Sequence, residues 1–343
     1  MEVEKEKDVI LDIQHLSTYF FSGKHNEIEL RAVDDLSYQV HRGECVAIIG
    51  ESGSGKSVSA LSIMELVSYP PGLIVEGKIM FHDKDILEMN DEEIRKIRGS
   101  KISMIFQEPS TALNPVVKVG KQISESLRIH NPSMSKKDAW SRAVELLSMV
   151  EIPNPEVRAN QYPFELSGGM QQRVMIAMAM SCNPEILIAD EPTTALDVTV
   201  QAQVLEQLNS LRAKYDMALI LITHNLGVVA RYADTVKIMY GGKIVEEGSP
   251  DDIFDHPHHP YTLGLIRAVP RLDLPISYGL HSIEGEPPDM TKVKPQSCAF
   301  ADRCSYATEE CRNCRPPLEE IYPGHHCACF HKDETKKERD ELI

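Results

Sequence analysis

The pattern of apolar and polar positions predicts a sheet of buried strands that alternate with helices. Four short apolar runs are typical of strands inside such a sheet: 45–49, 102–106, 186–189 and 218–222. Nearer the N-terminus, 9–13 and 36–40 instead alternate apolar with polar residues, which indicates half-exposed antiparallel strands. We therefore expect an α/β fold with a flanking antiparallel sheet.

Helices are predicted in three places. One covers 57–66, and another is capped by Ser167 and continues to about residue 182. Between 119 and 150 the pattern becomes helical and more polar, with proline breaks at 132 and 153. We expect this part of the chain, about 115–180, to form a helical subdomain.

The segment Gly50–Ser57 matches the phosphate-binding loop pattern G-x-x-x-x-G-K-[ST] at every fixed position. It follows a predicted strand and precedes a predicted helix, which is the context that the motif needs. Its glycines allow backbone conformations in which successive N–H groups point at one polyphosphate. Lys56 is expected to reach the β- and γ-phosphates, and Ser57 to offer its hydroxyl to Mg²⁺. The sequence therefore predicts a nucleotide site.

Two carboxylates follow the apolar run 186–189. Asp190 and Glu191 would lie at the carboxyl end of a strand, where open α/β sheets bind their ligands. We expect Asp190 to hold Mg²⁺ through its water shell, and Glu191 to orient or deprotonate the attacking water. His224 ends the next strand and could bond the γ-phosphate and the catalytic carboxylate together. In isolation, acidic residues or a histidine at a strand end are often incidental.

Composition narrows the class of protein. The 343 residues carry a net charge of −16, which argues against a nucleic-acid surface. No apolar run approaches the roughly 20 residues that cross a bilayer, and the N-terminus lacks an apolar signal-peptide core. We therefore expect a cytoplasmic location. Two of the eight cysteines, Cys45 and Cys182, are expected in the core; the others crowd between 298 and 329, where metal binding is more common than disulfides in a reducing compartment.

Six motifs in one order resemble those of the ATP-binding cassette (ABC) ATPases. They are Gly50–Ser57 (Walker A), Gln107 (Q-loop), Leu166–Gln171 (signature), Ile186–Glu191 (Walker B), Ala195–Asp197 (D-loop) and His224 (switch). The resemblance implies a hydrolysis-competent P-loop ATPase with catalytic Glu191, His224 and Gln107, and Mg²⁺ at Ser57, Gln107 and Asp190. It implies nucleotide contacts from Phe20, Ser52, Gly53, Ser54, Gly55, Lys56, Ser57, Val58, Ser167, Gly168, Gly169 and Gln171.

Phe20 owes its role to this resemblance. By residue type it would more often be a packing residue in the irregular piece between the two N-terminal strands. The family places an adenine-stacking aromatic at this position.

Further segments resemble the dipeptide/oligopeptide permease ATPases: Phe106–Pro109, Leu113–Pro115, His259–Thr262 and the late cysteines. This implies an energy-coupling subunit on the cytoplasmic face of the membrane. Its partners would be a paralogous ATPase, two transmembrane permease subunits and an extracytoplasmic substrate-binding protein, and the signature would face the other ATPase's nucleotide. Nickel and oligosaccharide importers use similar ATPases. A soluble ABC ATPase that acts on nucleic acid is a further alternative, although the chain has neither a second cassette nor a long coiled coil.

The domain organisation that follows is a disordered start (1–8), a nucleotide-binding domain (9–255), a cysteine-rich extension (256–330) and a charged tail (331–343). The extension is too short to bury a large core, so it needs a staple. Its cysteine spacing matches neither zinc fingers nor common ferredoxins. The resemblance favours a [4Fe-4S] cluster on Cys298, Cys304, Cys311 and Cys329. Zn²⁺, disulfides, free thiols, a ligand exchange with Cys314 or Cys327, and a sensor role stay open.

Overall fold

The computed structural model describes residues 8–23, 27–194, 196–269 and 282–335. The predicted disordered start and most of the charged tail therefore lie outside the described residues. The chain divides into two compact units. Unit 1 consists of Met1–Val9, Val40–Glu44 and Ile86–Ile222, and unit 2 of Ile10–Gln39, Cys45–Asp85 and Thr223–Ile343.

Unit 1 contains three parallel strands, β6 (Ile102–Ile105), β7 (Ile186–Asp190) and β8 (Ala218–Ile222), with β7 between the other two. Every residue of β7 and β8 is buried, which confirms the interpretation of these apolar runs as interior strands. Asp190 pairs with Ile222 in register, so β7 and β8 end at the same edge. Side chains that follow either strand therefore gather at one edge of this sheet.

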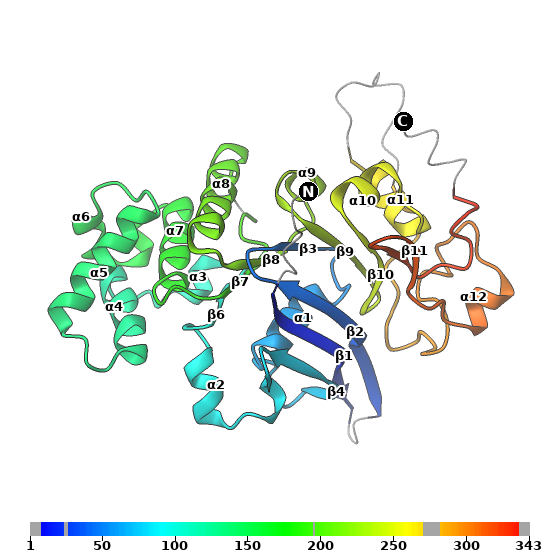
Figure 1. Ribbon diagram of the computed structural model, residues 1–343, viewed down its shortest axis with the longest axis horizontal. Coiled ribbons are helices and arrows are strands. Elements are labelled where there is room, and N and C mark those ends of the chain that lie inside the picture. The colour runs from blue at the N-terminus through cyan, green and yellow to red at the C-terminus, as the bar shows by residue number, and fades with distance from the viewer. Residues whose placement is uncertain (1–7, 24–26, 195, 270–281, 336–343) are drawn as a thin grey trace, which may run out of the picture. The chain divides into compact units, whose positions relative to one another are not determined.

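Helices make up most of the rest of unit 1. They are η1 (Ile86–Glu88), α2 (Asp91–Ile97), α3 (Pro109–Ala112), α4 (Val119–His130), α5 (Lys136–Met149), α6 (Pro155–Ala159), η2 (Pro163–Glu165), α7 (Gly168–Ala179) and α8 (Val198–Tyr215). Helices α4 to α7 pack together (Figure 1). The predicted helical stretch 119–150 is thus two helices, and α5 begins after Ser135, whose hydroxyl accepts a hydrogen bond from the Asp138 N–H.

Unit 2 contains a five-stranded sheet in the order β11 (Glu319–Tyr322), β12 (His325–Cys327), β10 (Lys243–Gly248), β9 (Thr235–Tyr240), β3 (Cys45–Ile49). Strand β3 runs parallel to β9, and the other neighbours are antiparallel. All of β3 is buried, as its apolar run predicts. The helices of this unit are α1 (Lys56–Ile63), α9 (Leu226–Tyr232), α10 (Pro250–Asp255), α11 (Pro260–Arg267) and α12 (Glu309–Asn313).

A second sheet in unit 2 has the order β2 (Ile28–His41), β1 (Val9–Ser22), β4 (Gly72–Phe81), β5 (Lys84–Asp85). It confirms the predicted antiparallel sheet, with Leu11 opposite Phe81. Strand β1 is longer than expected: its pairing with β4 continues to Phe20, which lies opposite Gly72. The prediction that Phe20 sits in an irregular piece was therefore wrong, because cross-strand pairing extends the strand there.

The extension shares the core of unit 2. Phe300 is 4% exposed and belongs to the same apolar cluster as Ile49 and Ile238. Its ring lies edge-on to Tyr240 at 5.1 Å between centroids and tilted against Tyr261 at 5.5 Å. Aromatic pairs of this kind contribute beyond their buried area. The extension is thus packed against strands of the main sheet.

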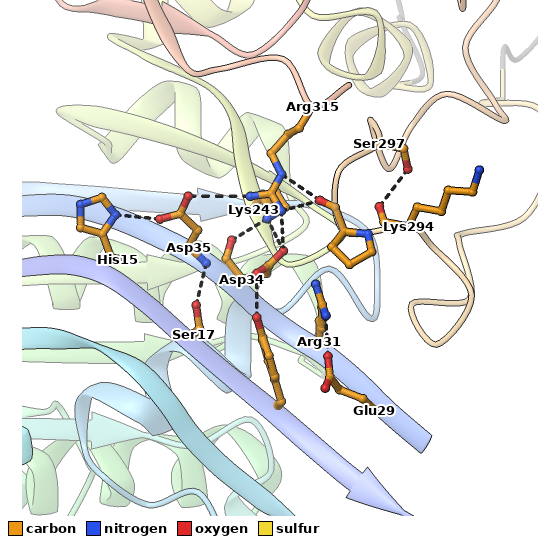
Figure 2. A network of polar contacts seen from close by, with 12 residues as sticks. His15, Ser17, Glu29, Arg31, Asp34, Asp35, Lys243, Lys294, Ser297 and Arg315 are labelled. Atoms are coloured by element: carbon orange, nitrogen blue, oxygen red, sulfur yellow. Dashed lines mark hydrogen bonds and ion pairs between the residues drawn. The ribbon is translucent and has the colours of Figure 1, made fainter. Parts of the chain in front are cut away.

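A network of charges also joins the extension to β2 and β10 (Figure 2). The buried carboxylate of Asp34 contacts the ammonium of Lys243 and lies 3.0 Å from Nη2 of Arg315. The Tyr19 hydroxyl donates to the same carboxylate at 2.9 Å. Burial alone would raise the pKa of Asp34, but the hydrogen bond and charge of Lys243 hold it below its usual value. Arg315, in the extension, is therefore fixed to the antiparallel sheet.

Candidate functional site

The phosphate loop of unit 2 joins β3 to α1, as predicted. Gly53 and Gly55 have φ of +80° and +101°, a left-handed conformation that residues other than glycine rarely adopt. A Cβ atom on Gly50 would lie 2.2 Å from the carbonyl oxygen of Met239 in β9. One on Gly55 would lie equally close to the Ala32 oxygen. Conformation and crowding both require glycine, because the loop lies directly on neighbouring backbone.

Lys56 is the first residue of α1 and is 6% exposed. Its ammonium donates to the carbonyl oxygens of Gly50 at 2.7 Å and Glu51 at 2.9 Å. The loop therefore curls around this charge. Ser57 and Val58 follow on the same helix, so the Ser57 hydroxyl lies at the N-terminal end of α1, where hydroxyl oxygens are suited to Mg²⁺.

The predicted catalytic carboxylate lies in unit 1, immediately after β7. Oε2 of Glu191 accepts hydrogen bonds from Gln107 Nε2 at 3.1 Å and from the Thr194 hydroxyl at 2.8 Å. Glu191 has φ of +45°, and its backbone N–H donates to the Ile222 oxygen at 2.9 Å. Such a conformation is strained for a residue with a Cβ and is concentrated at functional positions. Asp190 is 5% exposed at the end of the strand.

The predicted signature forms the start of α7 in unit 1. The Ser167 hydroxyl accepts from the Met170 N–H at 3.4 Å, which confirms Ser167 as the N-terminal cap. Ser167 and Gly168 are exposed, and a Cβ on Gly168 would meet no atom within 4 Å. A Cβ on Gly169 would lie 3.0 Å from Val200. The amide of Gln171 donates to the Pro163 oxygen at 2.8 Å and so holds the preceding turn.

The other predicted residues are divided between the units. Unit 2 carries Phe20 on β1 and an exposed His224 in the segment before α9. Unit 1 carries the predicted D-loop, in which the Asp197 carboxylate caps α8 by accepting from the Val200 N–H at 3.0 Å. Ala195 lies outside the described residues. Of the three predicted catalytic residues, Gln107 and Glu191 lie in the same unit and are joined by a hydrogen bond.

Four cysteines of the extension line one small cavity, which we call the thiol cavity: Cys298, Cys304, Cys311 and Cys329. The backbone N–H of His331 donates to Sγ of Cys329, at 3.3 Å between nitrogen and sulfur. Burial raises the pKa of Cys298 to about 11 and that of Cys329 to about 12, so both thiols are protonated at neutral pH.

The two extra cysteines lie elsewhere. Cys314 is exposed and Cys327 is buried in β12, and neither lines the thiol cavity. Within the described ranges, no three His, Cys, Asp or Glu side chains are arranged to bind one metal ion.

Sequence reasoning missed a group of side chains behind the phosphate loop. Arg303 of the extension forms an ion pair with Glu51 at 2.6 Å, and the Tyr261 hydroxyl accepts from the Glu51 N–H at 2.8 Å. Both partners lie more than 200 positions from the loop in sequence. Tyr261 lies in the segment His259–Thr262, but no local sequence pattern indicates its contact with Glu51.

Comparison with known proteins gives two family matches. Residues 33–194 match the ABC transporter family, and 245–311 match the C-terminal region of oligopeptide/dipeptide transporters. The chain is 49% identical over 317 residues to the oligopeptide transport ATP-binding protein OppD of Bacillus subtilis, covering 92% of this chain and 88% of that protein. It is 48% identical to the dipeptide transport ATP-binding protein DppD of the same organism, covering 92% and 90%.

Solved structures also match. The dimeric post-hydrolysis state of the ATP-binding cassette MJ0796, bound to ADP and Pi, is 29% identical with a TM-score of 0.63, covering 70% of this chain and 98% of that one. The cbiO1 protein of Clostridium perfringens, part of the transporter complex cbiONQ, is 26% identical with a TM-score of 0.61, covering 73% and 92%. Among the helices that the structure describes, none has the length and apolarity to cross a bilayer.

Proposed function

The chain belongs to the ABC transporter family, within its oligopeptide/dipeptide branch, and from this we propose that it is the ATP-hydrolysing subunit of a membrane importer of di- and oligopeptides. The main support for ATPase activity is the phosphate loop. Its glycines pack against the backbone of neighbouring strands, and the ammonium of Lys56 is enclosed by carbonyl oxygens of the loop. The match of the C-terminal region to peptide transporters carries the substrate class.

The residues of this chain divide the work of hydrolysis. Lys56 binds the β- and γ-phosphates as a point charge, and the loop N–H groups donate hydrogen bonds to the phosphate oxygens. Glu191, oriented by Gln107 and Thr194, positions the attacking water and takes its proton. His224 contacts the γ-phosphate, and Phe20 stacks on the adenine. Bound Mg²⁺ neutralises phosphate charge, and the oxygen atoms of Ser57, Gln107 and Asp190 are the hard ligands that suit it.

Partners follow from surfaces of unit 1. Ser167 and Gly168 are exposed at the start of α7 with open space around them, which favours contact with the nucleotide of a second ATPase subunit. Exposed apolar side chains also occur between residues 116 and 164 of this unit: Val116 is 78% exposed, Val157 60% and Phe164 70%. Such side chains suit a helix of a permease subunit. We propose a paralogous ATPase subunit and two permease subunits on the cytoplasmic face of the membrane, with a substrate-binding protein outside.

Vesicle uptake tests the substrate class. The chain would be reconstituted with its co-purifying ATPase, permease and binding-protein subunits, with ATP at the face that carries the ATPases. We expect uptake of labelled dipeptides with wild type and none with Glu191→Gln. Uptake of a nickel chelate or an oligosaccharide without peptide uptake would contradict the proposal.

We further propose that the thiol cavity holds a [4Fe-4S] cluster that staples the extension. Four cysteines that line one cavity, with a backbone N–H donating to the sulfur of Cys329, match the ligand type of such clusters. Zn²⁺, which also takes cysteine ligands, is the alternative occupant.

Iron analysis tests the cluster with a matched pair of variants. Anaerobically purified wild type should contain iron and sulfide and absorb broadly in the visible range. Cys298→Ser should lose this absorption, and Cys314→Ser, outside the cavity, should keep it. Stoichiometric zinc without iron, or equal iron in both variants, would contradict the proposal.

A further inference from the structure

Arg303 of the extension lies against the phosphate loop. Its guanidinium forms two hydrogen bonds to the Glu51 carboxylate, from Nη1 at 2.6 Å and from Nη2 at 3.2 Å. The Arg303 side chain is 6% exposed and that of Glu51 is 27% exposed. A bidentate pair with one partner buried has a fixed geometry and is stronger than a surface ion pair.

The surroundings of Arg303 allow it little freedom. Nη1 also donates to the Tyr240 hydroxyl at 3.2 Å, and Nε donates to the backbone carbonyl oxygen of Glu284 at 2.9 Å. The guanidinium carbon lies 5.8 Å from the ring centroid of Tyr240 and 5.9 Å from that of Phe300. Arg303 is thus fixed by the core of unit 2, so it can act as an anchor for Glu51.

Glu51 transmits this contact to Lys56. Its carboxylate is held by Arg303 and its backbone N–H by Tyr261, while its carbonyl oxygen accepts from the Lys56 ammonium at 2.9 Å. The same oxygen accepts from the Ser54 N–H at 3.2 Å. One residue therefore connects the extension with the cation and with a backbone amide of the loop.

We propose that Arg303 is a positioning residue for nucleotide binding: by holding Glu51, it keeps the phosphate loop in the conformation that binds the phosphates. The extension thereby sets the nucleotide affinity of its own cassette. This inference rests on the proposed nucleotide binding by the loop.

A second arginine of the extension, Arg312, provides a control because its ion pair does not involve the phosphate loop. Arg312 pairs with Asp302 at 2.7 Å within the extension, and its side chain is 51% exposed. Arg312→Gln removes one arginine charge and one ion pair, as Arg303→Gln does, but leaves every contact of the loop in place. It is the matched control.

The experiment measures the Kd of a fluorescent MgATP analogue on the full chain, with thermal melting alongside. We expect Arg303→Gln to raise the Kd about tenfold, within the range of coupling between neighbouring residues. Arg303→Lys keeps the charge but not the two N–H donors that bind the carboxylate together, so we expect the Kd to rise about threefold. Arg312→Gln should bind like wild type.

A double-mutant cycle separates positioning from a general structural role. If Arg303 acts through Glu51, the pair Glu51→Gln with Arg303→Gln binds no more weakly than either single variant. Additive losses, or an unchanged Kd in Arg303→Gln, would overturn the inference. If Arg303→Gln does not fold, Glu51→Gln removes the same ion pair, and an unchanged Kd there is equally decisive. Failure of the wild type to bind would instead refute the proposed function itself.

Discussion

Replacing Gly50 with alanine should displace the phosphate loop without unfolding the chain. The new Cβ would lie 2.2 Å from the Met239 oxygen, and real Cβ contacts stay above 3.0 Å, so the loop must move by at least about 0.8 Å. Met239 cannot yield, because it is fully buried in β9 between β3 and β10. Such a shift takes the loop N–H groups out of line with the phosphates, and a hydrogen bond to a charged group contributes about 1.5–3 kcal/mol. We therefore expect the Kd for MgATP to rise about a hundredfold, or about 2.8 kcal/mol.

Titration with a fluorescent MgATP analogue checks this value, and circular dichroism checks that the variant is folded. Gly53→Ala is the graded comparison: its Cβ would meet nothing within 4 Å, but its φ of +80° is strained. That strain is about 1–2 kcal/mol, so we expect at most about a thirtyfold loss of affinity. Wild-type affinity in Gly50→Ala, or a greater loss in Gly53→Ala, would refute the steric reasoning.

Three further predictions concern single residues. Glu191→Gln should retain MgATP binding and lose roughly 10²–10⁴ in turnover, because the amide keeps the shape but not the base; steady-state hydrolysis measures this, and wild-type turnover would contradict it. Lys56→Ala should weaken nucleotide binding itself, since it removes the charge on the β- and γ-phosphates; an unchanged Kd would exclude this role. Burial lowers the pKa of His259 from 6.5 to about 4, so the folded protein keeps it neutral while the unfolded chain takes up a proton. In metal-free protein, stability should therefore fall as pH drops from 6.5 towards 4, by about 2 kcal/mol near pH 5. His259→Asn keeps an acceptor for the Tyr261 N–H, and urea unfolding should show this acid loss removed; an equal loss in both proteins would contradict the assignment.

Local patterns predicted the strands and the phosphate loop because the information is contained in a few neighbouring residues. The buried strand β3, the loop and the start of α1 all lie within 45–57, and their apolar run, glycines and lysine fix the geometry together. The predicted ends of helices were less accurate. Helix α1 ends at Ile63 rather than at residue 66, and Glu65, two residues later, has φ of +48°. A single residue with positive φ that is not glycine has no distinctive sequence pattern, so the end of the helix cannot be predicted from it.

Contacts between distant segments could not be predicted. Phe20 was placed in a loop because its partner Gly72 lies on another strand. Glu51 and Arg303 are separated by 252 positions, and neither has a sequence context that indicates the other. Cysteine spacing likewise left the ligand set open, whereas in the folded chain neither Cys314 nor Cys327 lines the thiol cavity.

Strand β12 covers what would otherwise be an open edge of the unit 2 sheet. It pairs Cys327 with Glu246 and His326 with Glu247, and the Ala328 N–H donates to the Val245 oxygen at 2.8 Å. Without the last strands, β10 would present unpaired N–H and C=O groups, a template for pairing with other chains. The outermost strand β11 is only four residues long and carries exposed Glu319 and Glu320, whose like charges oppose stacking of a second copy. We therefore expect the C-terminal strands to oppose aggregation, and a chain shortened before Glu319 should precipitate where the 343-residue chain stays dispersed.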